Sequence, residues 1–146
     1  MSRDAPFAVI VLPYAVELDG VVSYAVFRKA GRRDRGWRTL TGTGVEGEAP
    51  LESACREAWR LAHVPADAAF MALDNWAPQD IGPLPFGLVE HAFAVRVCQD
   101  EVRPRQRGVE HSWVSYEAAD ERLRRRADRD ALWELRRRLG RPAACA

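Results

Sequence analysis

The spacing of apolar residues along the chain predicts a series of strands and helices. The run Phe7–Tyr14 is almost continuously apolar, which is typical of a strand buried on both faces. Val21–Arg28 predicts a second strand paired with the first, because Leu18–Gly20 between them has the composition of a turn. Further strands are predicted at Leu88–Val97, which alternates most clearly, at Ala69–Leu73, and over the short stretch Ser112–Val114.

The segment after Pro50 has the spacing of an amphipathic helix instead. Pro50 suits the first turn of a helix, where its missing N–H costs no hydrogen bond. We expect the helix to end at His63, because histidine tolerates a positive φ and Pro65 follows closely. The glycines that precede it, Gly42 to Gly47, predict a loop. The expected buried face of this helix comprises Leu51, Ala54, Cys55, Ala58, Leu61 and Ala62.

A terminal helix is predicted from Tyr116 onwards. Gly140 is its expected C-cap, so residues 141–146 are expected to form a frayed tail. The 146 residues suit one domain, with a core over about 7–139 and neither repeats nor an internal boundary. The apolar stripe of the helix comprises Ala131, Leu132, Leu135 and Leu139.

Composition indicates a soluble globular chain, with 47% hydrophobic and 29% charged residues. The net charge of +1 gives no reason to expect nucleic acid or a membrane as a bulk partner. The apolar run near the N-terminus is too short for a signal peptide or a membrane span, so we expect a cytoplasmic protein. Cys55, Cys98 and Cys145 are too scattered for a metal cluster, and the first two are expected to be buried thiols.

The stretch from Thr41 to Val64, TGTGVEGEAPLESACREAWRLAHV, holds the residues best suited to chemistry. Gly42, five residues, Glu48, seven residues and then Arg56-Glu57 resemble the first two-thirds of the Nudix box. That box reads Gly-x5-Glu-x7-Arg-Glu-U-x-Glu-Glu-x-Gly-U, where U is apolar. The flanking run GWRTLTGTGVEGE is similar to the pyrophosphohydrolases that act on dATP and dihydroneopterin triphosphate.

The last third of the box departs from the family pattern. Arg60 and Leu61 stand where the family has two adjacent glutamates, and His63 stands where it has glycine. Those glutamates would share one helix face with Glu57, because they lie three and four residues further along. The box is therefore degenerate at two of its three expected carboxylates.

The resemblance runs from about Phe7 to about Leu139, and it implies an α/β fold: an α/β/α sandwich with a mixed sheet. It also implies an enzyme that cleaves a diphosphate bond in a nucleoside di- or triphosphate derivative. Such chemistry is mainly a matter of positioning and charge neutralisation by divalent metal ions. We therefore expect Mg²⁺ or Mn²⁺ as the cofactor if the protein is active, and no metal if it is not.

The resemblance assigns roles to particular residues. Glu57 and Glu46 are candidate metal ligands, with Glu52 as a further candidate, and Glu57 and Glu110 are candidate catalytic residues. Glu57 is alternatively an ion-paired helix residue, and Glu110 alternatively a loop carboxylate. The candidate substrate-binding residues are Arg28, Lys29, Gly44 and Arg60, and the structural box residues are Gly42, Glu48 and Arg56. Arg28 and Lys29 are alternatively part of a solvated charged loop.

Arg60 has two interpretations. It has an ion-pair partner of opposite sign in Glu57, one helical turn away. A guanidinium also suits phosphate geometry, so Arg60 could replace the metal and hold a substrate phosphate directly.

Two main hypotheses of function follow. The chain is either a divergent Nudix hydrolase or an inactive Nudix-fold protein that binds a nucleotide or another diphosphate ligand. A weaker third is a homodimer built on Trp59, which would otherwise pack against its own chain. The loop 75–87 offers Trp76 and Phe86 to stack on a ligand ring or on the core.

Overall fold

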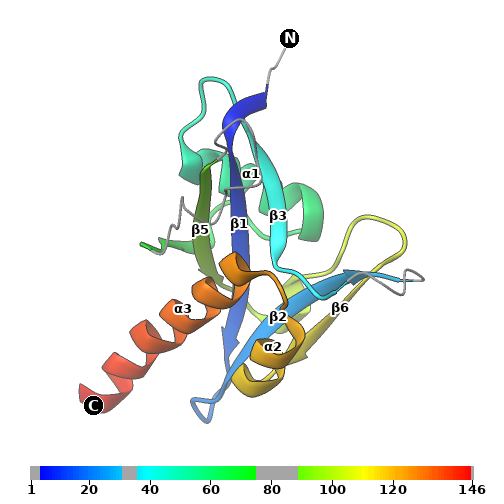
Figure 1. Ribbon diagram of the computed structural model, residues 1–146. Coiled ribbons are helices and arrows are strands. Elements are labelled where there is room, and N and C mark those ends of the chain that lie inside the picture. The colour runs from blue at the N-terminus through cyan, green and yellow to red at the C-terminus, as the bar shows by residue number, and fades with distance from the viewer. Residues whose placement is uncertain (1–3, 31–35, 75–88, 146) are drawn as a thin grey trace.

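A six-stranded mixed sheet forms the centre of the computed structural model, which describes residues 4–30, 36–74 and 89–145 (Figure 1). Its strands run in the order β4-β5-β1-β2-β6, and β3 also pairs with β1. β1 is parallel to β5, and the other pairings are antiparallel. The strands are β1 Asp4–Val16, β2 Val22–Lys29, β3 Leu40–Val45, β4 Ala69–Ala72, β5 Val89–Arg96 and β6 Val109–Val114. The helices are α1 Pro50–Ala62, η2 Gln99–Glu101, α2 Tyr116–Arg122 and α3 Arg126–Cys145.

Helices cover both faces of this sheet. Alternate residues of β1 enter two separate apolar clusters, one packed against α1 and the other against α2 and α3 (Figure 1). Val9, Ile10, Val11 and Leu12 are each at most 1% exposed, as a strand covered on both faces requires. Burying one such side chain contributes about 1.5–3 kcal/mol. The predicted α/β/α sandwich with a mixed sheet is confirmed.

β1 shares one of its edges between two partners. Residues Ala8–Val11 pair with β3, and residues Tyr14–Val16 pair with β2. Its opposite edge pairs with β5 over the whole length from Phe7 to Tyr14. β2 therefore leaves β1 beyond Tyr24 and continues beside β6.

Helix α1 has the predicted termini. It starts at Pro50, and Glu52 accepts a hydrogen bond from the backbone N–H of Ala49 at 2.7 Å. It ends at His63, whose φ of 62° is left-handed and whose N–H donates to the carbonyl of Trp59 at 3.1 Å. Ala54, Ala58 and Ala62 are fully buried, whereas Leu51 is 48% exposed, so its expected place on the buried face is wrong.

The predicted glycine loop before α1 is a strand over its first part. Gly42 and Gly44 lie on one face of β3, where there is no room for a side chain. A Cβ at Gly42 would come 2.7 Å from Oε1 of Glu57, and one at Gly44 would come 2.7 Å from Cε2 of Phe7. Close packing of the strand against α1 and β1 therefore selects these glycines. Only Gly47, with φ of 94°, uses the conformational freedom of glycine to turn the chain.

The predicted terminal helix is two helices. Ser115 caps α2 by accepting a hydrogen bond from the N–H of Ala118, and the extended backbone of Leu123 ends it. α3 then continues through Gly140 to Cys145, so the expected C-cap is wrong, whereas the expected tail over 141–146 stays a prediction. Gly140 does not have a positive φ, and a glycine without one does not stop a helix.

The expectations for the cysteine thiols and for the loop 75–87 have different outcomes. Cys98 is exposed and Cys55 is half-buried, so the expectation of two buried thiols is wrong. The loop 75–87, with Trp76 and Phe86, lies outside the described residues, so its suggested roles stay predictions. Among the described helices, none is long and apolar enough to cross a membrane.

The close packing at Gly44 generates a stability prediction. Gly44→Ala is expected to lower the free energy of unfolding by about 1–3 kcal/mol, because the added methyl group overlaps the ring of Phe7. Gly140→Ala is the matched control, because a Cβ there meets nothing within 4 Å. Alanine is the better helix former, so the control is expected to gain up to about 1 kcal/mol. Urea unfolding measures both, and equal stability of the two variants would contradict the packing.

Candidate functional site

The carboxylate of Glu57 is buried between α1 and β3 and held by cations. Its side chain is 5% exposed. Oε2 accepts a hydrogen bond from Nε of Arg60 at 2.5 Å, and Oε1 lies 3.5 Å from Nη1 of Arg56. Oε1 also accepts from the backbone N–H of Thr43 at 3.3 Å. A buried anion requires such partners, and here they are two guanidinium groups and a peptide N–H.

Arg56 also ties α1 to the segment before it. Its Nε donates to Oε2 of Glu48 at 3.0 Å, and its Nη2 donates to the carbonyl of Thr43 at 2.8 Å. Oε1 of Glu48 accepts from the hydroxyl of Ser53 at 2.6 Å. The hydrogen bond from Arg56, followed by that from Ser53, holds the pKa of Glu48 below its usual value. These contacts are of the kind that a structural role for Glu48 and Arg56 requires.

Arg28 and Glu110 are paired with one another. They are cross-strand neighbours on β2 and β6, and Nε of Arg28 donates to Oε2 of Glu110 at 2.8 Å. The guanidinium of Arg28 also lies over the ring of Trp37, 4.5 Å from its centroid. The structure therefore brings a candidate substrate-binding residue and a candidate catalytic residue together as counter-ions.

A cavity of about 220 Å³ opens on the α1 side of the sheet, at the end of β2 and the start of β3 and β6. It contains three predicted features: the cations Arg28 and Lys29, and Leu61 of the box helix. Its other polar lining residues had no assigned role in the sequence analysis. The full lining is Phe27, Arg28, Lys29, Gly36, Arg38, Thr39, Leu40, Thr41, Leu61, Gln106 and Val109.

Sequence reasoning missed the wall formed by Arg38, Thr39 and Thr41. The available signal was their place in the run GWRTLTGTGVEGE, immediately before the box. Arg38 donates through Nη2 to the hydroxyl of Thr41 at 2.9 Å, and through Nε to Asp128 of α3 at 3.2 Å. Arg38 and Asp128 are 90 residues apart in the sequence, so no local sequence pattern indicates their contact.

Other predicted residues lie outside the cavity lining. Glu46 is exposed in the turn after β3, and Gly44 packs against Phe7. Glu52 caps the start of α1. Arg60 has a side chain that is 59% exposed, and only its pairing with Glu57 connects it to the box.

These residues do not fit a divalent metal ion as the family holds one. In the ranges 4–30, 36–74 and 89–145, no three His, Cys, Asp or Glu side chains are grouped so as to hold a metal. Mg²⁺ takes hard oxygen ligands in near-octahedral geometry. Here a guanidinium and an isobutyl group replace two carboxylates, and both oxygens of Glu57 already face cations.

Trp59 is partly covered by its own chain. It is 51% exposed, and the guanidinium of Arg105 lies over its ring, 4.4 Å from the centroid. Nε of Arg105 also donates to the backbone carbonyl of Trp59 at 2.9 Å. The expected homodimer through Trp59 stays a prediction.

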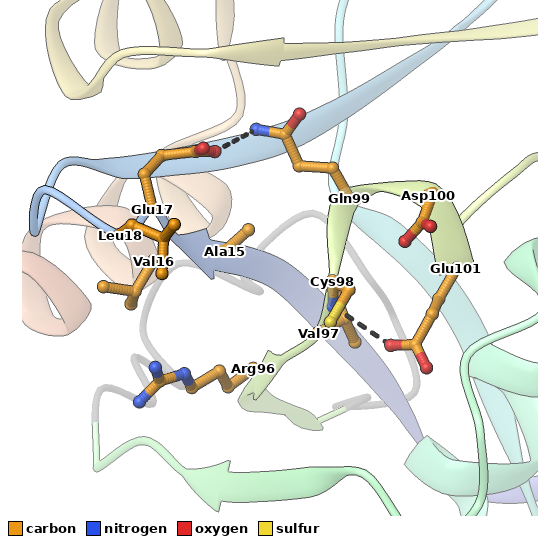
Figure 2. Close-up of a pocket in the computed structure, with 10 residues that line it drawn as sticks. All are labelled: Ala15, Val16, Glu17, Leu18, Arg96, Val97, Cys98, Gln99, Asp100 and Glu101. Atoms are coloured by element: carbon orange, nitrogen blue, oxygen red, sulfur yellow. Dashed lines mark hydrogen bonds between the residues drawn. The ribbon is translucent and has the colours of Figure 1, made fainter.

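A second, more open pocket of about 570 Å³ lies at the opposite end of β2, between the ends of β1 and β5 (Figure 2). It is lined by Arg96, Cys98 and the hairpin around Glu17, whose carboxylate accepts a hydrogen bond from Gln99 at 2.8 Å. None of the candidate site residues lines it. Arg96 is exposed and belongs to this pocket, not to the cavity beside α1.

No protein-family model matches this chain, and no curated protein matches it in sequence. Solved structures do. A candidate Nudix hydrolase from Listeria monocytogenes superposes with a TM-score of 0.80 at 25% identity, over 94% of this chain and 97% of that one. The dihydroneopterin triphosphate pyrophosphohydrolase of E. coli superposes with a TM-score of 0.68 at 17% identity, over 89% of this chain and 94% of that one.

A third structure is the Nudix domain of NrtR from Shewanella oneidensis, complexed with ADP ribose. It gives a TM-score of 0.69 at 12% identity, over 91% of this chain and 87% of that one. All three cover almost the whole of this chain, so the likeness includes both helical layers as well as the sheet. With this architecture and the partial box sequence from Gly42 to Glu57, the chain belongs to the Nudix superfamily.

Proposed function

We propose that this Nudix protein binds a nucleotide or another small diphosphate compound in the cavity beside α1, and that binding needs no divalent metal. One observation carries the proposal: the buried carboxylate of Glu57 is already neutralised by Arg60 and Arg56. The cation that the family recruits from solution is replaced here by cations of the chain itself.

Charge arithmetic supports this assignment. Two unit charges at 4–5 Å interact by about 3–4 kcal/mol at an effective dielectric constant near 20. A divalent cation beside Glu57 would be repelled by the guanidinium groups of Arg56 and Arg60. Each repulsion would be about twice the value for two unit charges, because the metal ion carries two. With Leu61 in place of a carboxylate, no compensating ligand is available on that helix face.

The cavity has the composition expected for a ring with charged groups attached. Phe27, Leu40 and Leu61 are apolar, whereas Arg28, Lys29 and Arg38 are cationic. Its volume of about 220 Å³ is below the ~300–1,000 Å³ of typical ligand sites, so one ring fits inside and phosphates would lie at the cationic rim. Ligands of this kind occur in the names of two fold neighbours, which are an ADP ribose complex and a dihydroneopterin triphosphate pyrophosphohydrolase.

The second candidate function is metal-dependent cleavage of a diphosphate bond. It is favoured by the Listeria structure, which is described as a candidate Nudix hydrolase and shares 25% identity with this chain. In that case Arg60 would have to release Glu57, and Arg28 would have to release Glu110 to act as a general base.

Ligand binding with and without metal separates the two functions. We expect ADP or ADP-ribose at one hundred times its Kd to stabilise the protein by about 2.7 kcal/mol, equally in EDTA and in MgCl₂. For a chain of this size the melting temperature would rise by about 5–10 °C. Thermal unfolding measures this shift. Stabilisation that appears only with Mg²⁺, together with turnover of the nucleotide, would support the hydrolase instead.

Restoring the box tests the electrostatic argument directly. The double variant Arg60→Glu, Leu61→Glu is expected to bind Mn²⁺ at least tenfold more tightly than the wild type, because it places three carboxylates on one helix face. Isothermal titration with Mn²⁺ alone measures the affinity. Adding Glu57→Gln to the double variant is the matched control and should remove most of the gain. Wild-type protein that already binds Mn²⁺ as tightly as the double variant would overturn the proposal.

A further inference from the structure

We infer that Arg38 is the residue that anchors the phosphate of the ligand, and that Asp128 is the residue that positions Arg38. The inference rests on the proposed function and deepens it, because it locates an anion subsite at one wall of the cavity. Neither residue belongs to the box.

Asp128 is a fully buried carboxylate in the first turn of α3, with 0% exposure. Its Oδ1 accepts from the hydroxyl of Thr39 at 2.9 Å, and its Oδ2 accepts from the backbone N–H of Thr39 and from Nε of Arg38, each at 3.2 Å. A buried carboxylate is costly unless it is fully hydrogen-bonded, and three donors meet that requirement. All three come from the wall of the cavity.

Arg125 contributes a further cation near Asp128. Nη2 of Arg125 lies 2.6 Å from each carboxylate oxygen of Glu90 on β5. Burial by itself would lower the pKa of Arg125, but the hydrogen bonds and charge of Glu90, together with the charge of Asp128, raise it. Arg125 thus adds a positive charge in the neighbourhood of Asp128, beside the three donors from the cavity wall.

Arg38 itself is held at four points. Its backbone exchanges both hydrogen bonds with Phe27, at 2.7 and 2.8 Å. Its Nε is held by Asp128, and its Nη2 by the hydroxyl of Thr41 at 2.9 Å. Within the described part of the chain, Nη1 has no hydrogen-bond partner, and the side chain lines the cavity. A guanidinium with its inner side fixed and its outer nitrogen free is pre-organised to bind an oxyanion.

Arg28, also in the lining, is less suited to this role. It pairs through Nε and Nη2 with Glu110, whose side chain is 42% exposed. An incoming phosphate would meet a neighbouring carboxylate there. The carboxylate that holds Arg38 is instead fully buried behind the cavity wall, so it orients the cation without facing the ligand.

The test is a titration calorimetry series in EDTA, with ADP and with inorganic pyrophosphate as probes. Arg38→Gln is expected to weaken the binding of both at least tenfold, or ~1.4 kcal/mol. Arg38→Lys should recover only part of the loss, because it keeps the charge but loses the planar fork. Arg96→Gln removes an exposed arginine at the far pocket and should change neither affinity.

The positioning role of Asp128 is measured by a double-mutant cycle. Asp128→Asn alone is expected to weaken pyrophosphate binding several-fold, yet to have no further effect in the Arg38→Gln background. Additive losses would mean that Asp128 supports only the fold. If Asp128→Asn does not fold, Thr41→Val removes the other side-chain partner of Arg38, and the same non-additivity is expected.

The outcomes distinguish the inference from the proposed function. Wild-type binding of ADP that is unchanged in Arg38→Gln would overturn the anion subsite and leave the proposed function standing. Binding of pyrophosphate through Arg38 without binding of any nucleotide would retain the subsite and overturn the nucleotide assignment. Failure of the wild type to bind either probe would overturn both. Succinate, added as a competitor, identifies a carboxylate-specific site if it displaces pyrophosphate at equal concentration, and that result would overturn the phosphate assignment.

Discussion

The ion pair between Glu57 and Arg60 is the constraint on which the chemistry of this molecule depends. Glu57 is almost fully buried, so its charge must be balanced wherever the chain folds. In a box with three carboxylates, cations from solution balance them. Here the balance comes from the same helix, one turn further along, so the folded protein carries its own counter-ion. The charge of Glu57 is therefore balanced within the folded chain itself, and the cavity lined by Leu61 lies beside this ion pair.

Local patterns predicted what is governed by local physics. The apolar run of β1, the termini of α1 at Pro50 and His63, and the alternation of β5 were all readable, because each is fixed by burial or backbone conformation within a few residues. β3 was missed because Gly42 and Gly44 favour a loop locally, whereas their tertiary contacts require glycine in a strand. The hydrogen bonds from Arg38 and Thr39 to Asp128 span about 90 residues, so no sequence pattern could have revealed them.

The two helical layers serve the cavity in different ways. α1 contributes Leu61 and, through Glu57, the neutralised box. α3 lies on the opposite face of the sheet, yet Asp128 in its first turn reaches the segment between β2 and β3 that lines the cavity. The cavity wall formed by Arg38 and Thr39 is thus held by α3, which contributes no described residue to the lining. Changes in α3 can therefore alter the geometry of this wall through Arg38 and Thr39.

The parallel pairing of β1 with β5 also matters while the chain is being made. Phe7 pairs with Val89 and Tyr14 pairs with Arg96, so one edge of the most apolar strand has no partner until residues 89–96 have been synthesised. Over that interval the emerging chain exposes unpaired backbone groups flanked by Val9, Val11 and Leu12, a combination prone to association between chains. Yield in cells should consequently depend on chaperone supply more than the stability of the finished domain would indicate.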